Sequence, residues 1–133
     1  TGVPPLLVCH SMGGLAARAW LKAHSSEARV RHVVTIGTPH RGTWLARFGH
    51  AHNGLQMRLS SEWLGRLDDG MHPERHGRFT CWYSNTDNIV FPTSTAALPG
   101  ADNRLVRGAA HVQMAFLPEV MTATLALLDV SKR

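Results

Sequence analysis

Cysteine and acidic residues are both scarce in this sequence of 133 residues. The two cysteines, Cys9 and Cys81, define no disulfide framework, and both lie in apolar, strand-like stretches where buried free thiols are common. Nine Asp and Glu residues stand against 14 Lys and Arg residues, for a formal net charge of +5. The arginines are scattered and not interleaved with aromatic residues, so we expect no nucleic-acid partner. The cysteine content leaves a cytoplasmic and a secreted location open.

Long apolar runs, internal repeats and low-complexity tracts are missing as well. No segment approaches the roughly 20 apolar residues that a membrane helix needs, so we expect no transmembrane segment. The composition, 44% hydrophobic and 17% charged, is typical of a globular protein, and the length suffices for one small domain with a core. The oligomeric state stays open.

Apolar runs and helix-forming stretches alternate along the first part of the chain. Residues 6–9 follow two prolines and predict a short buried strand. Helix formers dominate 14–24, and the β-branched run RHVVTIG at 31–37 predicts a second buried strand that ends in the loop GTPHRG. Buried strands joined by helical crossovers are typical of the α/β class, with a mostly parallel sheet flanked by helices.

A longer segment, 44–77, separates these elements from the rest. Within it, Leu55, Leu59, Trp63 and Leu67 recur every four residues, which predicts an amphipathic helix that ends at DDG. This apolar stripe is either ordinary core or a mobile cover over an acyl-chain pocket. The remaining predicted elements are strands at 78–84 and 103–108, a loop at 85–92, a turn at 109–116 and a closing amphipathic helix at 117–128.

The stretch LLVCHSMGG places Ser11 between the first predicted strand and the first predicted helix. A serine hydroxyl is a poor nucleophile until a base removes its proton, and it must project above the sheet to meet a substrate. The small residues Cys9 and Gly13 let strand and helix approach closely, and a helix N-terminus directs N–H groups at the reacting oxygen. Ser11 is therefore a candidate nucleophile, with a helix N-cap serine as the structural alternative.

The stretch VCHSMGGLAAR resembles the nucleophile elbow of the α/β-hydrolase superfamily, especially its bacterial lipases and esterases. TIGTPHRGT, YSNTDNIV and AAHVQM extend the resemblance over most of the chain. Cys9 departs from the family, which usually has glycine there, and we expect mild crowding from it. The resemblance implies that 1–133 is a partial α/β-hydrolase domain, running from the nucleophile elbow to the C-terminal helix, with 44–77 as a candidate cap or lid insert.

In this superfamily an acid and then a histidine follow the serine along the chain. Of nine histidines only His111 lies after Tyr83, in the predicted turn before the last helix. Asp87 follows a predicted strand, as the acid should, whereas Asp102 precedes one in the turn-forming sequence GADN. The resemblance therefore implies a catalytic triad of Ser11, His111 as the base and Asp87 as the acid. A surface-loop histidine and a turn aspartate are the structural alternatives for His111 and Asp102.

An oxyanion hole needs two donors, and we expect the backbone N–H of Met12 to be one. In the family the second donor comes from a loop after an earlier strand, and the sequence contains neither that strand nor that loop. We therefore expect the chain to be the C-terminal portion of a larger hydrolase or a truncated gene product. On its own it is expected to show poor activity and marginal solubility.

Other notable residues favour structural roles. His10 precedes the nucleophile, and packing is the simpler explanation both for it and for the loop TPHRG at 38–42. His72 and His76 are four residues apart, but Pro73 lies between them. No cysteine or carboxylate cluster with usable spacing accompanies these histidines or the pair at 50 and 52, so we expect no metal site.

Together with the resemblance, these residues predict a serine hydrolase of the lipase or esterase type. It would cleave carboxylic esters through an acyl-enzyme, without a cofactor, and its partner would be a small-molecule ester or lipid substrate. A thioesterase or an amidase with the same triad is one alternative, since the fold hosts them all. An inactive hydrolase-like fragment that lacks the N-terminal half of the fold is the other.

Overall fold

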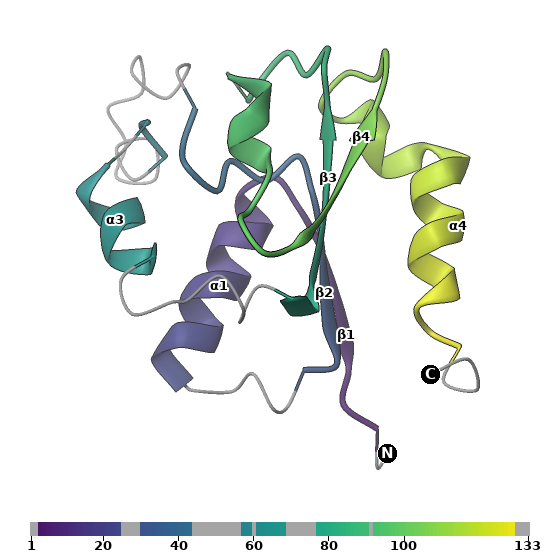
Figure 1. The fold of residues 1–133 in the computed structure, drawn as a ribbon, viewed down its shortest axis with the longest axis horizontal. Coiled ribbons are helices and arrows are strands. Elements are labelled where there is room, and N and C mark those ends of the chain that lie inside the picture. The colour runs from purple at the N-terminus through teal and green to yellow at the C-terminus, as the bar shows by residue number, and fades with distance from the viewer. Residues whose placement is uncertain are drawn as a thin grey trace.

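The computed structural model describes residues 3–24, 30–43, 57–59, 61–68, 77–90 and 92–129. Within these ranges the structure has four strands, β1 Leu6–His10, β2 His32–Ile36, β3 Phe79–Ser84 and β4 Asp102–Val106. The helices are α1 Met12–His24, α3 Glu62–Asp68 and α4 Pro118–Ala126, with short 3-10 helices η4 Thr93–Ala96 and η5 Gln113–Phe116. The strands form one parallel sheet in the order β1-β2-β3-β4, with α1 and α4 on opposite faces (Figure 1). The predicted parallel α/β class is confirmed.

Side chains along each strand alternate between the two faces of the sheet, so the sheet separates two apolar clusters. The cluster on the α4 side contains Val34, Ile36, Trp82, Val106, Ala109, Met114 and Val120. The cluster on the α1 side contains Leu21, Val30, Val33, Phe79, Cys81 and Leu98. Because β2 and β3 contribute to both clusters, these two central strands are the most buried elements of the fold.

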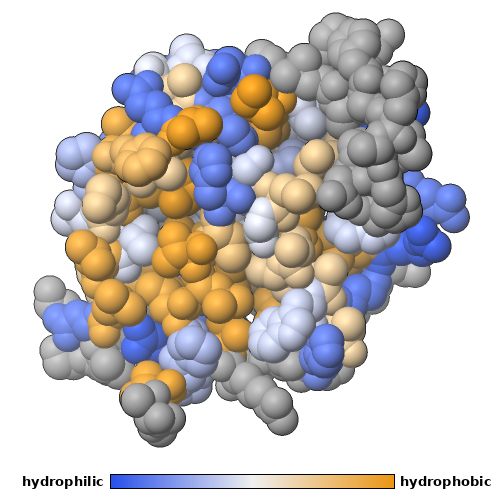
Figure 2. All heavy atoms as spheres, turned by 180° about the vertical axis from the view of Figure 1, so that it is seen from behind, coloured by the Kyte–Doolittle hydropathy of each residue, from blue (hydrophilic) through white to orange (hydrophobic). Residues whose placement is uncertain are grey.

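The edge strand β1 and the helix α4 leave apolar side chains at the surface. Figure 2, which shows the molecule from behind, displays a broad apolar area on that face. Val8 in β1 is 53% exposed, and Met121 and Leu125 in α4 are 50% and 61% exposed. No helix among the described residues is long and apolar enough to cross a membrane.

The helix predicted within the insert is shorter than the four-residue repeat suggested. Residues 57–59 form a turn instead, because Arg58 pairs with Thr43 in an isolated β-bridge. Ser61 then starts α3, since its Oγ accepts the backbone N–H of Leu64 at 3.2 Å. The prediction that Leu59 belongs to this helix is therefore wrong, and residue 55 lies outside the described residues. The cap or lid role of 44–77 stays a prediction.

The first turn of α1 packs directly on the loop that follows β2. A Cβ atom built on Gly14 would lie 2.6 Å from Cγ2 and 2.8 Å from Cβ of Thr38, which is fully buried. Only glycine allows this close approach, because those distances are shorter than real Cβ contacts. Gly14 therefore fixes how closely the helix behind Ser11 approaches the sheet.

We predict that Gly14→Ala lowers the free energy of unfolding by about 2 kcal/mol, because the added methyl group overpacks a closed contact. Gly65→Ala is the matched control, since Gly65 lies in α3 and a Cβ there meets nothing within 4 Å. The control should raise stability by roughly 0.5–1 kcal/mol, the usual gain from glycine to alanine in a helix. Urea unfolding measures both. A Gly14→Ala variant as stable as the unsubstituted chain would contradict the close contact.

Candidate active site

Ser11 occupies a sharp turn between β1 and α1. It is the only non-glycine residue with a positive φ, 54°, among the residues that the structure describes. Its backbone N–H donates to the carbonyl of Ile36 at 2.9 Å, and its own carbonyl accepts the N–H of Gly14 at 3.2 Å. Left-handed backbone at a residue with a side chain is strained, and it persists where the surrounding structure enforces it. The turn therefore has the strand, serine and helix order of a nucleophile elbow.

Both cysteines are protonated thiols rather than reactive thiolates. Burial raises the pKa of the Cys9 thiol and raises the pKa of Cys81 to about 11, so both stay protonated at neutral pH. The Cβ of Cys9 would lie 3.8 Å from a Cβ on Gly13, which is ordinary van der Waals contact. This distance concerns a side chain added at Gly13, so the mild crowding expected from Cys9 stays a prediction.

The predicted base and acid form a buried hydrogen-bonded pair. Nδ1 of His111 lies 3.0 Å from Oδ2 of Asp87, and the two residues are 4% and 2% exposed. The other carboxylate oxygen accepts the backbone N–H groups of Ile89 and Val90 at 2.8 and 2.9 Å. Burial on its own would raise the pKa of Asp87, but the hydrogen bonds from His111, Val90 and Ile89 outweigh it and hold the pKa below its usual value. Asp87 is therefore a carboxylate at neutral pH.

The backbone and the ring of His111 are also held from other sides. Its N–H donates to Oδ1 of Asn88 at 3.0 Å, and its carbonyl accepts from Nε2 of His10 at 3.2 Å. The ring packs on Gly37, where a Cβ would lie 3.1 Å from both Nδ1 and Cε1. Gly37 also has a φ of 61°, so it suits glycine for two reasons. Sequence reasoning missed Asn88 and Gly37, although each adjoins a residue or loop that it had singled out.

These contacts place the His111 ring beside the end of β1. Ile36 accepts the N–H of Ser11, and Gly37, the next residue, packs against the ring of His111. Asp102, the rival acid, begins β4 and is exposed, so it lies at the other end of the parallel strands from Ser11. Its Oδ2 pairs with Arg104 at 2.7 Å instead.

The loop at 38–42 is built into the core through a buried polar chain. Nε2 of His40 is 3.1 Å from Oγ1 of Thr35, and Nη1 of Arg18 donates to the carbonyl of His40 at 3.3 Å. Arg18, only 1% exposed, also forms an ion pair with Asp68 of α3. This fits the packing role expected for the loop. The burial of Arg18 could not be predicted from the sequence, because Arg18 is one of several scattered arginines.

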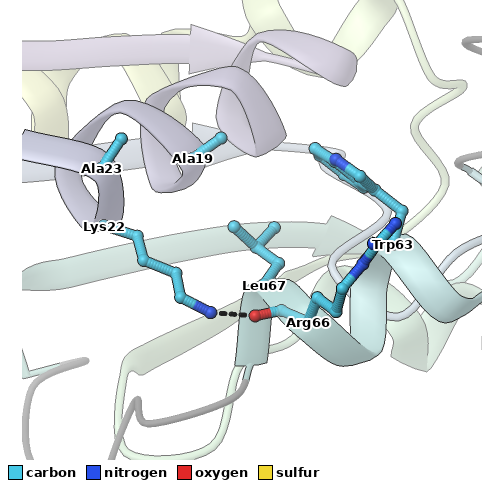
Figure 3. Close-up of a pocket in the computed structure, with 6 residues that line it drawn as sticks. All are labelled: Ala19, Lys22, Ala23, Trp63, Arg66 and Leu67. Carbon is cyan, nitrogen blue, oxygen red and sulfur yellow. Dashed lines mark hydrogen bonds between the residues drawn. The ribbon is translucent and has the colours of Figure 1, made fainter.

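A shallow groove of about 470 Å³ lies between α1 and α3 (Figure 3). The ammonium group of Lys22 donates to the carbonyl of Arg66 there. The α1 residues of the groove come from the second half of the helix, at least two turns from Ser11, so the groove is separate from the candidate site. Its lining consists of Ala19, Lys22, Ala23, Trp63, Arg66 and Leu67.

Within the described ranges, no group of three or more His, Cys, Asp or Glu side chains gathers as potential metal ligands. The histidines at 50, 52, 72 and 76 lie outside those ranges. The expectations of no metal and no cofactor therefore stay predictions.

The pKa of Asp87 predicts how stability depends on pH. Because folding lowers this pKa, the stabilisation is present above the unfolded value of about 4 and is lost as the pH falls through the folded value. Asp87→Asn should therefore lower the free energy of unfolding by about 2 kcal/mol near neutral pH, and this loss should shrink as the pH falls below about 4 and through the lowered pKa of Asp87. Urea unfolding at several pH values measures the deficit.

Asp102→Asn is the matched control, since Asp102 is an exposed carboxylate in a surface ion pair. It should change stability by less than about 1 kcal/mol at every pH. A constant deficit for Asp87→Asn from neutral to acid pH would contradict the assigned role of the carboxylate.

The comparisons with known proteins agree with this architecture. A family model described as a PGAP1-like alpha/beta domain matches residues 5–100. The chain superposes on the mature lipase BlEst2 of Bacillus licheniformis with a TM-score of 0.77 at 19% identity, covering 96% of this chain and 66% of the lipase. Lipase B of Aspergillus fumigatus superposes with a TM-score of 0.66 at 25% identity, covering 77% of this chain and 28% of that lipase. No match was found among curated proteins.

The chain thus spans less than two thirds of the length of both lipases. The matched family region begins just before β1 and ends between η4 and β4. That region is more than half of the chain. The chain belongs to the PGAP1-like alpha/beta domain family, and its fold is that of the lipase- and esterase-like α/β hydrolases.

Proposed function

We propose that this chain carries the active site of a serine hydrolase that cleaves carboxylic esters, with Ser11 as nucleophile, His111 as base and Asp87 as acid. The observation that carries the proposal is the buried contact of 3.0 Å between Nδ1 of His111 and Oδ2 of Asp87, beside a strained serine turn. The buried contact between imidazole and carboxylate supports the base and acid roles, and the left-handed serine at a helix N-terminus supports the nucleophile role.

The state of the His111 ring follows from its partner. Because a carboxylate can only accept, Nδ1 of His111 carries the hydrogen of this bond, and Nε2 of the neutral ring is left as a proton acceptor. Nε2 would then remove the proton from Oγ of Ser11 as that oxygen attacks the ester carbonyl. The Asp87 carboxylate stabilises the imidazolium that forms and does not itself take the proton.

The remaining steps need no further acid or base. The negative charge of the tetrahedral intermediate would be stabilised by the backbone N–H of Met12, which lies in the first turn of α1 and has no acceptor within the helix. His111 passes its proton to the leaving alcohol as the ester C–O bond breaks, and an acyl-Ser11 ester remains. Water, deprotonated by the same Nε2, then releases the acid and restores the Ser11 hydroxyl.

Ester hydrolysis is favoured over other acyl transfers by the structural neighbours. Both are named as lipases, and lipases act on carboxylic esters. The same three residues could serve thioester or amide hydrolysis, because the fold does not choose between leaving groups. Hydrolysis rates on an ester, a thioester and an anilide that share one acyl chain would separate these activities.

The direct test is covalent labelling of the 133-residue chain with a fluorophosphonate probe, followed by intact mass and peptide mapping. We expect one adduct, on Ser11, because only a serine with an adjacent base attacks phosphorus readily. Ser11→Ala should abolish the adduct, and His111→Ala should slow labelling by at least about 100-fold.

Ser94→Ala is the matched control, since Ser94 is an exposed serine in η4. It should be labelled as fast as the unsubstituted chain. A folded chain that is not labelled, or one whose adduct persists in Ser11→Ala, would overturn the proposal.

A further inference from the structure

His10 is an exposed residue that nevertheless contacts the candidate base. Its Nε2 lies 3.2 Å from the carbonyl oxygen of His111, a contact that spans 101 positions in the sequence. The two imidazole rings also meet, with centroids 4.8 Å apart and planes tilted by 48°. His10 is therefore linked to His111 through both its ring nitrogen and its ring surface.

The direction of the hydrogen bond is set by chemistry. A carbonyl oxygen can only accept, so Nε2 of His10 carries the hydrogen and donates it. His10 pairs in register with Ile36 of β2, and Gly37, the next residue, packs against Nδ1 and Cε1 of the His111 ring. The ends of β1 and β2 therefore both pack against the His111 ring.

We propose that His10 is a positioning residue that fixes His111 relative to Ser11. This inference rests on the proposed function. His10 directly precedes Ser11 in the chain, so its bond to the His111 carbonyl connects the backbone of the nucleophile turn to the backbone of the base. Asn88 anchors the N–H of His111 and Asp87 anchors its ring, so the carbonyl held by His10 is the third fixed point. A catalytic group must hold its geometry closely for proton transfer to be efficient.

A packing role explains the contacts of His10 less well than a role in positioning His111 does. Since the side chain is exposed, its removal takes little apolar surface out of the core and should scarcely change global stability. The hydrogen bond joins the last residue of β1 to the turn that contains His111, and neither residue belongs to the apolar clusters of the core. Its loss should therefore affect the reactivity of Ser11 more than the folding of the chain.

The test uses His10→Leu, which keeps bulk but removes the donor, and His10→Gln, whose side-chain amide can still donate to the carbonyl. We expect the limiting rate of fluorophosphonate labelling to fall roughly 3- to 10-fold in His10→Leu, the effect of losing one hydrogen bond at the base. The probe concentration at half-saturation should stay unchanged, and His10→Gln should recover most of the rate. Both variants should unfold in urea like the unsubstituted chain.

His24→Leu is the matched control, because its ring Nδ1 also donates to a backbone carbonyl, that of Trp20 at 3.0 Å, but at the far end of α1. Its labelling rate should equal that of the unsubstituted chain. Wild-type labelling speed in His10→Leu, or equal slowing in His10→Gln and His24→Leu, would overturn the inference.

A second readout separates this inference from the proposed function. The exchange rate of the Nδ1 proton of His111, measured by NMR, reports how firmly the ring is held even in a chain that no probe labels. It should rise in His10→Leu and stay low in His10→Gln. If no probe labels the chain but the exchange rate follows this pattern in the two variants, only the proposed function is contradicted. If the chain is labelled but His10→Leu changes neither the exchange rate nor the labelling rate, only the role of His10 is contradicted.

Discussion

The buried hydrogen bond between His111 and Asp87 is the interaction on which the candidate site depends. Asp87 follows β3 and His111 follows β4, and these two strands are parallel neighbours, so the sheet brings their following loops together. A carboxylate that is only 2% exposed stays charged only where hydrogen-bond donors offset the cost of its burial. The N–H groups of Ile89 and Val90 are such donors. The loop after β3 is thus shaped around the Asp87 carboxylate, the proposed acid of the site.

A second constraint fixes the turn that holds Ser11, the proposed nucleophile. The positive φ of Ser11 turns the chain sharply from β1 into α1, and the contact of Gly14 with Thr38 sets how closely the helix approaches the sheet. Behind it, Arg18 joins α1 to the loop of His40 and to α3. The serine turn is therefore held from the sheet, from the loop after β2 and from the insert at once. The His10 contact would then tie this held turn to the base.

Much of this arrangement could be predicted from the sequence, because strand order and motif spacing are local signals. The apolar runs predicted all four strands, and the position of Asp87 after a strand distinguished it from Asp102 before one. The helix α3 could not be placed in the same way, since its start depends on a bridge between Thr43 and Arg58 and on the cap at Ser61. A four-residue repeat carries no information about such a tertiary contact.

The supporting residues were equally hidden from sequence reasoning. Asn88 and Gly37 act through a backbone hydrogen bond and a close approach to His111, and neither has a spacing rule that identifies it. The burial of Arg18 reverses the usual preference of arginine for the surface, and only its partners His40 and Asp68 explain it. Roles of this kind arise between elements far apart in the chain, so they become visible only once the fold is known.

The central claim is that Asp87 holds His111 as the Nδ1–H tautomer, with Nε2 free to accept a proton. The most direct measurement is the pair of imidazole ¹⁵N chemical shifts of His111 at neutral pH, assigned with the His111→Gln variant. We expect a protonated Nδ1 and an unprotonated Nε2, with the Nδ1 proton shifted far downfield by the carboxylate. Protonation at Nε2 instead, or averaged shifts typical of an exposed ring, would contradict it.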